Sequence, residues 1–322
     1  MAAIIKIENL YKIYPVGRER VVALGGINLE IEKGQICCIL GTSGSGKSTL
    51  LNQLAGLEKP TRGRVLIGGV NISSLSEGQL ARFRQKNVGF IFQSYNLLQS
   101  YTALENVAMP LMFRGFGKTL RNRRAKMILK QVGLGKRMNH KPAQMSGGQQ
   151  QRVGIARAFV AKPKIVFADE PTGNLDTRTT KEVMELMVRL CRKNKQTLVL
   201  VTHDRELALY ADRIITLIDG KVVDDRPNES IAEVGQDELQ EQSETQEPET
   251  QESQQMEQVV DALLPDDLRQ SAEPKDVLLP QTEELVEQEL ADSPLECPLT
   301  EPTETTESSV PDQPENNEQK GR

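Results

Sequence analysis

Residues 36–51 read "ICCILGTSGSGKSTLL", an apolar run followed by a glycine-rich turn and a segment of helical type. Gly41, Gly46, Lys47 and Ser48 satisfy the spacing G-x-x-x-x-G-K-[ST]. Glycines allow backbone N–H groups to wrap around phosphates, and the N-terminus of the following helix adds positive potential. The lysine then reaches the β- and γ-phosphates, while the serine hydroxyl ligates Mg²⁺. We therefore predict a strand, a phosphate-binding loop and a helix, with an ordinary glycine-rich turn as the alternative.

Further apolar runs alternate with longer helical segments along the next 180 or so residues. Because the runs are β-branched and apolar on both faces, they are typical of a parallel sheet covered by helices. Near the N-terminus, "IIKIENLYKIY" and "INLEIEKG" instead alternate apolar and polar residues, which predicts an antiparallel portion. We expect an α/β fold with a mainly parallel core. The predicted strands are 87–92, 164–169, 197–202 and 213–218, and the predicted helices are 47–56, 121–132, 147–161 and 178–194.

Charge divides the chain into two parts. Residues 1–227 carry 36 Lys and Arg against 18 Asp and Glu, whereas residues 228–322 carry 4 against 27. No aromatic residue follows Tyr210, and a stretch such as "QDELQEQSETQEPETQESQQ" buries too little apolar surface to offset the entropy of ordering. We predict a globular domain over residues 1–227 and an acidic, disordered tail over residues 228–322.

The sequence carries no recognisable targeting signal. No apolar run approaches the roughly 18 residues that a membrane-spanning helix needs, and the N-terminus lacks the apolar core of a secretory signal. We therefore expect a cytoplasmic protein without a transmembrane segment of its own. The cysteines form no C-x-x-C pair and are expected to be small buried hydrophobes rather than metal ligands. They are Cys37, Cys38, Cys191 and Cys297.

Polar residues follow two of the predicted strands. Asp169 and Glu170 end "KIVFADE", where ionised carboxylates are costly unless a cation faces them. We expect Asp169 to hold Mg²⁺ through water and Glu170 to polarise the attacking water, with an N-cap pair as the alternative. His203 ends "TLVLVTH" at a matching position, which favours a contact with the γ-phosphate, whereas His140 has no such context.

A second glycine-rich helix start lies in "KPAQMSGGQQQRVGIARA", residues 141–158. Each glycine costs a helix about 1 kcal/mol relative to alanine. Two of them at the mouth of an amphipathic segment therefore indicate that bare backbone is needed there.

Taken in order, "GTSGSGKST", "FIFQ", "MSGGQQQR", "VFADEP", "GNLD" and "VTHD" resemble the nucleotide-binding domain of ABC ATPases over essentially all of residues 1–227. The resemblance implies a P-loop NTPase core with a helical signature subdomain, and ATP and Mg²⁺ as cofactors. It also implies that two such domains pair head to tail. Ser146, Gly147 and Gly148 of one chain then close over the γ-phosphate held by Lys47 of the other, and the helix from about Gln149 supplies its dipole.

The resemblance assigns further roles. Gln93 is similar to the glutamine that touches Mg²⁺ and the attacking water, and Asp176 resembles the residue that communicates across the dimer. Tyr14, rather than Tyr11, is expected to stack on adenine because it precedes the turn "PVG". The expected catalytic residues are Glu170, His203 and Gln93, and the expected metal-site residues are Ser48, Gln93 and Asp169. The expected nucleotide contacts are Tyr14, Gly41, Ser43, Gly44, Gly46, Lys47, Ser48, Thr49, Ser146, Gly147, Gly148, Gln149 and Asp176.

A finer resemblance concerns "ENVAMPLMFRG", "DEPTGNLD" and "VTHDRELALYADRIITLIDGKVV". These stretches are similar to the subgroup that powers lipoprotein-release, macrolide-efflux, antimicrobial-peptide-resistance and FtsE-type systems. The subgroup implies an ATP-hydrolysing subunit that acts as a dimer on a separate membrane permease, at the inner face of the cell membrane. The apolar segment 94–113 is expected to contribute to docking through Tyr95, Leu97 and Leu98, with helical-subdomain core as its alternative.

Two other functions stay open at this point. One is an FtsE-like subunit that signals across the membrane rather than transporting a solute. The other is an ABC ATPase that acts on nucleic acid or the ribosome, which the basic charge of residues 1–227 favours. The joined second cassette, long coiled coil or zinc modules of such proteins are missing from the sequence. The basic residues between 121 and 130 are typical of a solvated helix face, so no direct nucleic-acid partner is expected.

Overall fold

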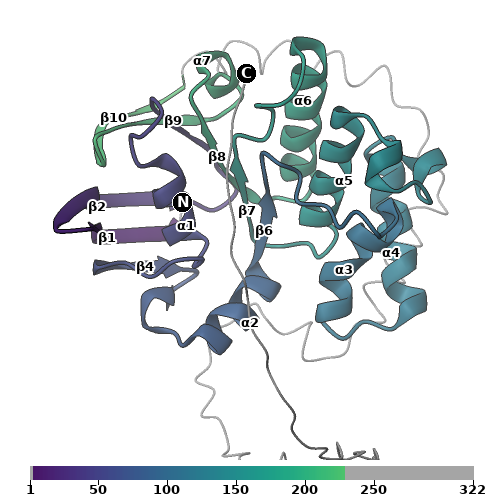
Figure 1. Cartoon of the computed structure of the whole chain (residues 1–322), viewed down its shortest axis with the longest axis horizontal. Helices are drawn as coiled ribbons and strands as arrows, with labels where there is room; N and C mark the ends of the chain where they lie inside the picture. Colours follow the sequence, from purple (N-terminus) through teal and green to yellow (C-terminus); the bar gives the residue numbers. More distant parts are fainter. Residues whose placement is uncertain (1–2, 229–322) are drawn as a thin grey trace, which may run out of the picture. The chain divides into compact units, whose positions relative to one another are not determined.

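Six strands form the central sheet among residues 3–228, the part of the chain that a computed structural model describes (Figure 1). In spatial order they are β10 (Lys221–Pro227), β9 (Arg213–Ile218), β3 (Ile36–Leu40), β8 (Thr197–Thr202), β7 (Ile165–Asp169) and β6 (Val88–Ile91). All neighbours pair in parallel except β10, which pairs antiparallel with β9 at one edge. The predicted, mainly parallel core is confirmed.

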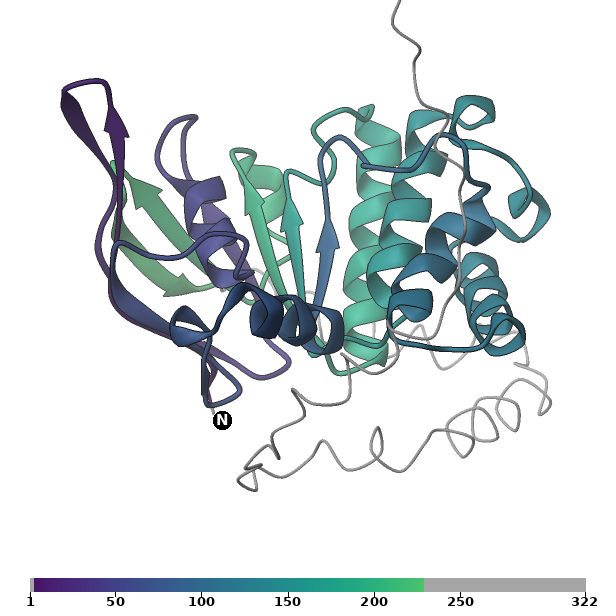
Figure 2. The same ribbon diagram turned by 60° about the horizontal axis from the view of Figure 1, so that its bottom comes forward.

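A second sheet of four strands is antiparallel, as the alternating N-terminal pattern predicted. Its order is β2 (Glu19–Glu32), β1 (Ala3–Val16), β4 (Arg62–Ile67) and β5 (Val70–Asn71). Strands β1 and β2 form a long hairpin, which Figure 2 shows beside β9 and β10. The backbone N–H of Gly25 in β2 donates to the carbonyl of Gly220 between β9 and β10, which joins the two sheets at this side.

The helices are α1 (Lys47–Leu54), α2 (Glu77–Asn87), α3 (Ala103–Phe113), α4 (Lys118–Gln131), α5 (Gly147–Phe159), α6 (Thr177–Lys193) and the short α7 (Arg205–Ala208). Four of the helices, α1, α4, α5 and α6, agree with the predicted segments to within a few residues, and α2, α3 and α7 are additional. Single 3₁₀ turns cover η1 (Ile72–Ser74), η2 (Gly135–Arg137) and η3 (Pro142–Gln144). Helices α3, α4 and α5 pack on one another and form the expected helical subdomain (Figures 1 and 2).

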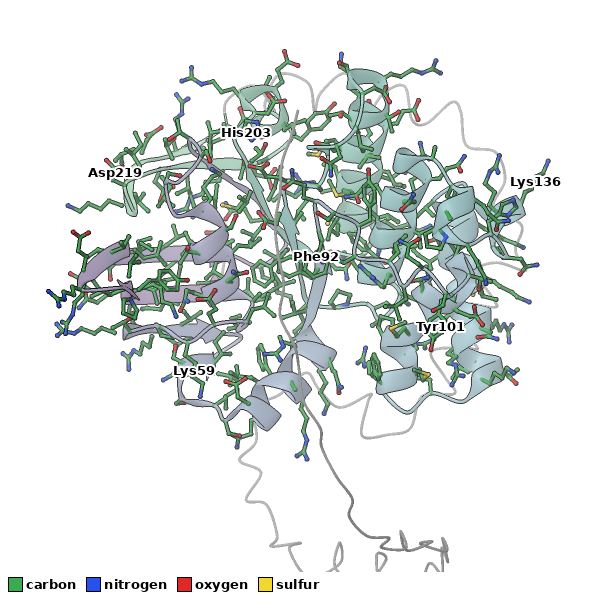
Figure 3. The ribbon with its side chains drawn as sticks, in the orientation of Figure 1. Lys59, Phe92, Tyr101, Lys136, His203 and Asp219 are labelled. Carbon is green, nitrogen blue, oxygen red and sulfur yellow. The ribbon has the colours of Figure 1, made fainter. Side chains whose placement is uncertain are left out.

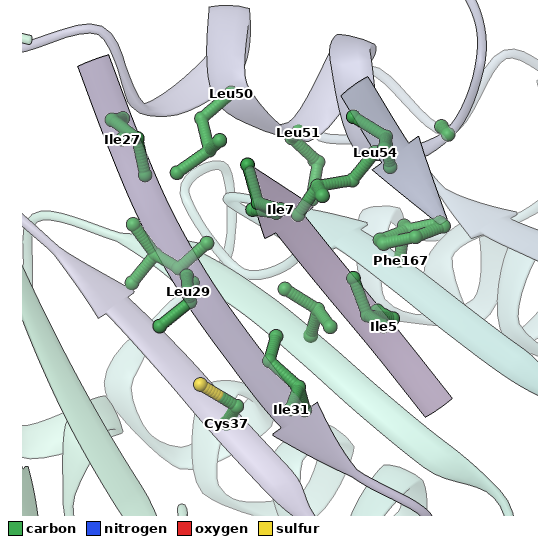
Figure 4. Close-up of a cluster of buried hydrophobic side chains, with 14 of the residues drawn as sticks. Ile5, Ile7, Ile27, Leu29, Ile31, Cys37, Leu50, Leu51, Leu54 and Phe167 are labelled. Carbon is green, nitrogen blue, oxygen red and sulfur yellow. The ribbon is translucent and has the colours of Figure 1, made fainter. Parts of the chain in front are cut away.

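A cluster of buried apolar residues anchors the helix that follows the phosphate-binding loop. Leu50, Leu51 and Leu54 on one face of α1 are fully buried against isoleucines of β1 and β2 and against Phe167 of β7 (Figure 4). Full burial of each leucine is worth about 1.5–3 kcal/mol. Because α1 begins at Lys47, this packing fixes the position of the loop that precedes it.

Within residues 3–228, no helix is both long and apolar enough to cross a bilayer. The predicted acidic tail lies outside the described residues except for Asn228, so the domain boundary near residue 227 stays a prediction. Cys37, Cys38 and Cys191 are buried and free, and Cys297 also lies outside the described part.

Candidate functional site

The glycine-rich loop connects β3 to α1 and ends at Gly46, the residue that precedes the first turn of α1. Gly46 has φ +97°, and a Cβ there would lie 2.6 Å from the carbonyl oxygen of Ala23. A Cβ on Gly41 would lie 2.4 Å from the carbonyl oxygen of Leu217. Both positions therefore require glycine, because any side chain would collide with the backbone of a neighbouring strand. Thr42, Ser43 and Gly44, between them, are exposed to solvent.

Lys47 folds back over this loop. Its side chain is 6% exposed, and its Nζ donates a hydrogen bond of 2.7 Å to the carbonyl oxygen of Thr42. A nearly buried ammonium with one carbonyl partner keeps unused donor capacity and positive charge for an anion. Ser48 and Thr49 follow on the first turn of α1, so these two side chains and that of Lys47 begin from one short segment.

The structure brings Ser48 and Asp169 together from segments more than 120 residues apart. Ser48 Oγ donates a hydrogen bond of 3.1 Å to Asp169 Oδ1 at the end of β7. Burial raises the pKa of the Asp169 carboxyl above its usual range, and the adjacent Glu170 carboxylate adds to the rise. The Ser48 hydrogen bond and Lys47 oppose it. The positive charge near Asp169 is therefore too weak to offset the cost of burying its ionised carboxylate.

Glu170 and His203 also meet, at the ends of β7 and β8. Glu170 Oε1 lies 3.0 Å from His203 Nδ1, and the His203 side chain remains 62% exposed at the end of β8 (Figure 3). Glu170 has φ +41°, a left-handed conformation that is unusual for a residue other than glycine. Its N–H donates to the Val201 carbonyl at 2.9 Å. The pair lines a cavity of about 710 Å³ that also includes Asp204 and Tyr210.

Gln93 follows β6 and contacts the loop after Glu170. The Gln93 carbonyl accepts a hydrogen bond of 3.1 Å from Asn174 Nδ2, and a Cβ on Gly173 would lie 2.9 Å from Gln93 Nε2. At the end of the same loop, Asp176 caps α6 by accepting hydrogen bonds from the N–H and hydroxyl of Thr179. These bonds lower the pKa of Asp176.

Ser146, Gly147 and Gly148 form the N-terminal end of α5, where Ser146 is exposed and the two glycines are half-buried. Ser146 and Gln149 make a capping box, in which Ser146 Oγ accepts from the Gln149 N–H and the Gln149 amide oxygen accepts from the Ser146 N–H. A Cβ on Gly148 would lie 2.5 Å from Thr179 Cγ2. Helix α5 contacts β6 while α1 contacts β7 and β8 from the other side (Figures 1 and 2). One chain therefore holds its signature segment and its phosphate-binding loop on opposite sides of the sheet.

Tyr14 lies in β1, close to the turn that joins β1 to β2, and its side chain contacts Glu58 and Lys12. Its hydroxyl donates to Glu58 Oε2 at 2.6 Å, and Lys12 Nζ lies 5.0 Å from its ring centroid and 3.1 Å from the same carboxylate. Burial and Glu58 raise the pKa of Tyr14 to about 12. Tyr11 instead packs over Gly26. No sequence pattern identified Lys12 or Glu58, because only the fold brings residues 12, 14 and 58 together.

The fold and its glycine-rich loop define a P-loop NTPase, and comparisons with known proteins narrow the class. The ABC transporter family pattern matches residues 24–173. An uncharacterized ABC transporter ATP-binding protein of Methanocaldococcus jannaschii is 51% identical over 220 residues, which cover 68% of this chain and 98% of that protein. The lipoprotein-releasing system ATP-binding protein LolD of Geobacter metallireducens is 47% identical over 225 residues, covering 70% and 100%.

A solved structure is also similar. The ATP-binding cassette MJ0796, in a dimeric post-hydrolysis state bound to ADP and Pi, superimposes with a TM-score of 0.66 at 42% identity, covering 70% of this chain and 98% of that one. The chain therefore belongs to the ABC transporter family, as one of its ATP-binding subunits, and it is an ATPase.

The raised pKa of Asp169 predicts that this carboxylate opposes folding of the nucleotide-free chain. Burial penalises the ionised form of Asp169. The resulting loss of folding stability therefore begins as pH rises through about 4, the usual pKa of an aspartate, and is complete above the raised pKa. Asp169→Asn is therefore expected to raise the thermal midpoint at pH 7 and to abolish hydrolysis. The gain should shrink toward pH 4 in thermal melts.

Asp176→Asn is the matched control with the opposite sign. The pKa of Asp176 is lowered, so its ionised form supports folding, and this variant should slightly lower the midpoint at pH 7. A midpoint that falls in Asp169→Asn would contradict the electrostatic account of this carboxylate.

Proposed function

We propose that the chain is the ATP-hydrolysing energy subunit of a LolD-type transporter and works as a head-to-tail dimer on a separate membrane permease. The observation that carries the proposal is the position of α5 and α1 on opposite sides of the six-stranded sheet. The exposed helix end at Ser146 can meet a phosphate-binding loop only if that loop belongs to another chain. Such a helix end suits a phosphate, because free N–H groups and the helix dipole both favour an anion.

The residues at the ends of β7 and α1 suit Mg²⁺. Ser48 and Asp169 present hard oxygen atoms 3.1 Å apart, and Asp169 lacks a full cationic partner. No cluster of three or more His, Cys, Asp or Glu side chains that could hold a metal occurs in residues 3–228. Mg²⁺ commonly binds through one or two carboxylates and completes its shell with substrate phosphates and water. Ser48, Asp169 and Gln93 would hold the ion, which would neutralise charge on the outer phosphates.

Glu170 is assigned the role of general base. It accepts a proton from the attacking water as the water oxygen bonds to the γ-phosphorus and the bond to the β-phosphate oxygen breaks, which yields ADP and phosphate. His203 Nδ1 lies 3.0 Å from the Glu170 carboxylate and is assigned to hold it in place, and the exposed His203 ring is assigned a contact with the γ-phosphate. Tyr14 is assigned the adenine, with its hydroxyl anchored on Glu58 so that one ring face stays fixed.

We assign an apolar groove on the helical subdomain as the site where the permease docks. It has a volume of about 280 Å³ and lies between β6 and helices α3 and α5. Figure 3 shows Phe92, which lines the groove, near the sheet, and Tyr101 among the helices. Phe113 lines this groove, and it is one of four large apolar residues of the segment 94–113 that are exposed by 41–60%. They are Leu98, Tyr101, Met112 and Phe113.

The docking surface differs in part from the one predicted from sequence. Leu97 is only 7% exposed, and Tyr95 is half-buried with its carbonyl bonded to Arg157. Leu97 therefore belongs to the core of the subdomain, and the prediction that it faces a permease is wrong. Leu98 remains available, and Met112 and Phe113 at the end of α3 replace the other two. The expected occupant is a short cytoplasmic apolar helix of the permease, since the groove is small and its lining includes Phe90, Phe92, Met109, Pro110 and Phe113.

Glu170→Gln is expected to bind ATP but to lose at least about 100-fold in hydrolysis rate, because the amide cannot accept the proton. ATP should then hold two chains together, which size-exclusion chromatography with and without Mg-ATP would detect as a dimer. Lys47→Ala is the control, since it removes the cation that faces the phosphates and should neither bind ATP nor dimerise. Wild-type turnover in Glu170→Gln would refute the assigned role.

Phe113→Glu is expected to weaken co-purification of a co-expressed permease at least about 10-fold, because it places a charge in an apolar interface. Basal ATPase activity should stay within about twofold, since Phe113 is 60% exposed and packs little in the free chain. Val22→Glu, on a β2 residue that is 53% exposed, is the matched control and should leave the permease bound. Equal loss of ATPase and permease would point to misfolding instead.

A further inference from the structure

Helix α5 carries a buried glutamine whose role is not explained by the signature segment. Gln151 is fully buried, and its Nε2 donates a hydrogen bond of 2.5 Å to the carbonyl oxygen of Pro171. Its amide oxygen is buried without a hydrogen-bond partner among the described residues. A buried amide with one unsatisfied atom costs free energy that an apolar side chain of the same shape would avoid. The donated bond to Pro171 is therefore the one evident advantage of glutamine at this position.

The carbonyl that Gln151 holds is next to the expected general base. The Glu170 N–H donates to the carbonyl of Val201 in β8 at 2.9 Å, and the Glu170 carbonyl accepts from the Gly173 N–H of the following loop at 3.1 Å. The ring of Pro171 fixes its own φ, so holding its carbonyl limits rotation of the whole segment. Glu170 stays in a left-handed conformation, φ +41°, which persists only where the surroundings restrain it.

We propose that Gln151 is a positioning residue for Glu170 of the same chain, and this proposal rests on the function proposed above. Strand β8 holds the Glu170 N–H, and Gln151 holds the carbonyl of the next residue, Pro171. The two hydrogen bonds together restrain the backbone at Glu170. Helix α5, whose first turn would bind the nucleotide held by the partner chain, thereby also positions the Glu170 carboxylate, which acts on the nucleotide held by its own chain. Loss of the Gln151 hydrogen bond should misplace the Glu170 carboxylate without touching the phosphate-binding loop.

The neighbouring Gln150 is a matched comparison within α5. Its Nε2 donates to the Met145 carbonyl at 3.1 Å, on the turn that leads into Ser146. The two glutamines are identical in type and adjacent in sequence, yet one bonds toward the catalytic loop and the other toward the signature segment. Methionine at either position keeps an unbranched side chain of similar length and removes the amide.

The first measurement compares kcat, KM and ATP affinity of the full chain carrying Gln151→Met or Gln150→Met. Gln151→Met is expected to lower kcat about 10-fold or more, because misplacement of a catalytic group is costly, while KM and ATP affinity change less than about twofold. A purely structural role would lower the thermal midpoint and ATP affinity together with kcat. Unchanged kcat in Gln151→Met would overturn the proposal.

The second measurement places the substitution in one chain of a dimer that has a single working site. Chains with Ser146→Arg are mixed with chains with Lys47→Ala, so that the one intact site takes its loop and Glu170 from the first chain and its signature from the second. Gln151→Met in the first chain is expected to lower the recovered ATPase activity about 10-fold, and the same substitution in the second chain should not. Any loss from Gln150→Met is expected only in the second chain.

Loss from Gln151→Met in the second chain alone, or equally in both chains, would overturn the positioning role, because either result assigns the residue to the signature or to general folding. Failure of the proposed function is distinguishable. In that case the parent mixture of Ser146→Arg and Lys47→Ala chains recovers no activity even before Gln151 is changed.

Discussion

The parallel direction of β3, β6, β7 and β8 is the constraint on which the site depends. Parallel neighbours end at the same edge of a sheet, so the segments that follow them meet there although they are far apart in the sequence. The glycine-rich loop follows β3, Gln93 follows β6, Glu170 follows β7 and His203 follows β8. The 3.1 Å contact of Ser48 with Asp169 and the 3.0 Å contact of Glu170 with His203 are direct results of this arrangement.

The same sheet also keeps the glycine-rich loop and the signature segment of one chain apart. Leucines of α1 are buried against the antiparallel sheet on one side, while α5 packs with α3, α4 and α6 on the other. Because both helices are held by extensive apolar packing, a small hinge motion within one chain would not bring Ser146 over Lys47. In the proposed function, pairing of two chains solves this problem, and hydrolysis would then depend on how a permease at the groove of the helical subdomain holds the chains.

Local patterns carried most of what could be predicted. The spacing of Gly41, Gly46 and Lys47 specifies a loop and a helix start, and continuous apolar runs specify buried parallel strands, so these elements follow from neighbouring residues alone. Contacts between residues far apart in the chain have no such local pattern in the sequence, so they could not be predicted. The burial of Leu97, the hydrogen bond from Gln151 to Pro171 and the anchoring of Tyr14 by Glu58 all depend on how helices and strands pack. The left-handed conformation of Glu170 could not be predicted from the sequence either, because glutamate has no preference for it.

The central claim is that a working site needs residues from two chains, and the concentration dependence of the unmodified full chain tests it most directly. ATP hydrolysis per chain is measured at saturating Mg-ATP over a range in which the chain changes from monomer to dimer. We predict that the rate per chain rises in proportion to concentration while monomers predominate, and then levels off as dimers form. A rate per chain that stays constant down to concentrations where light scattering finds only monomers would contradict the account.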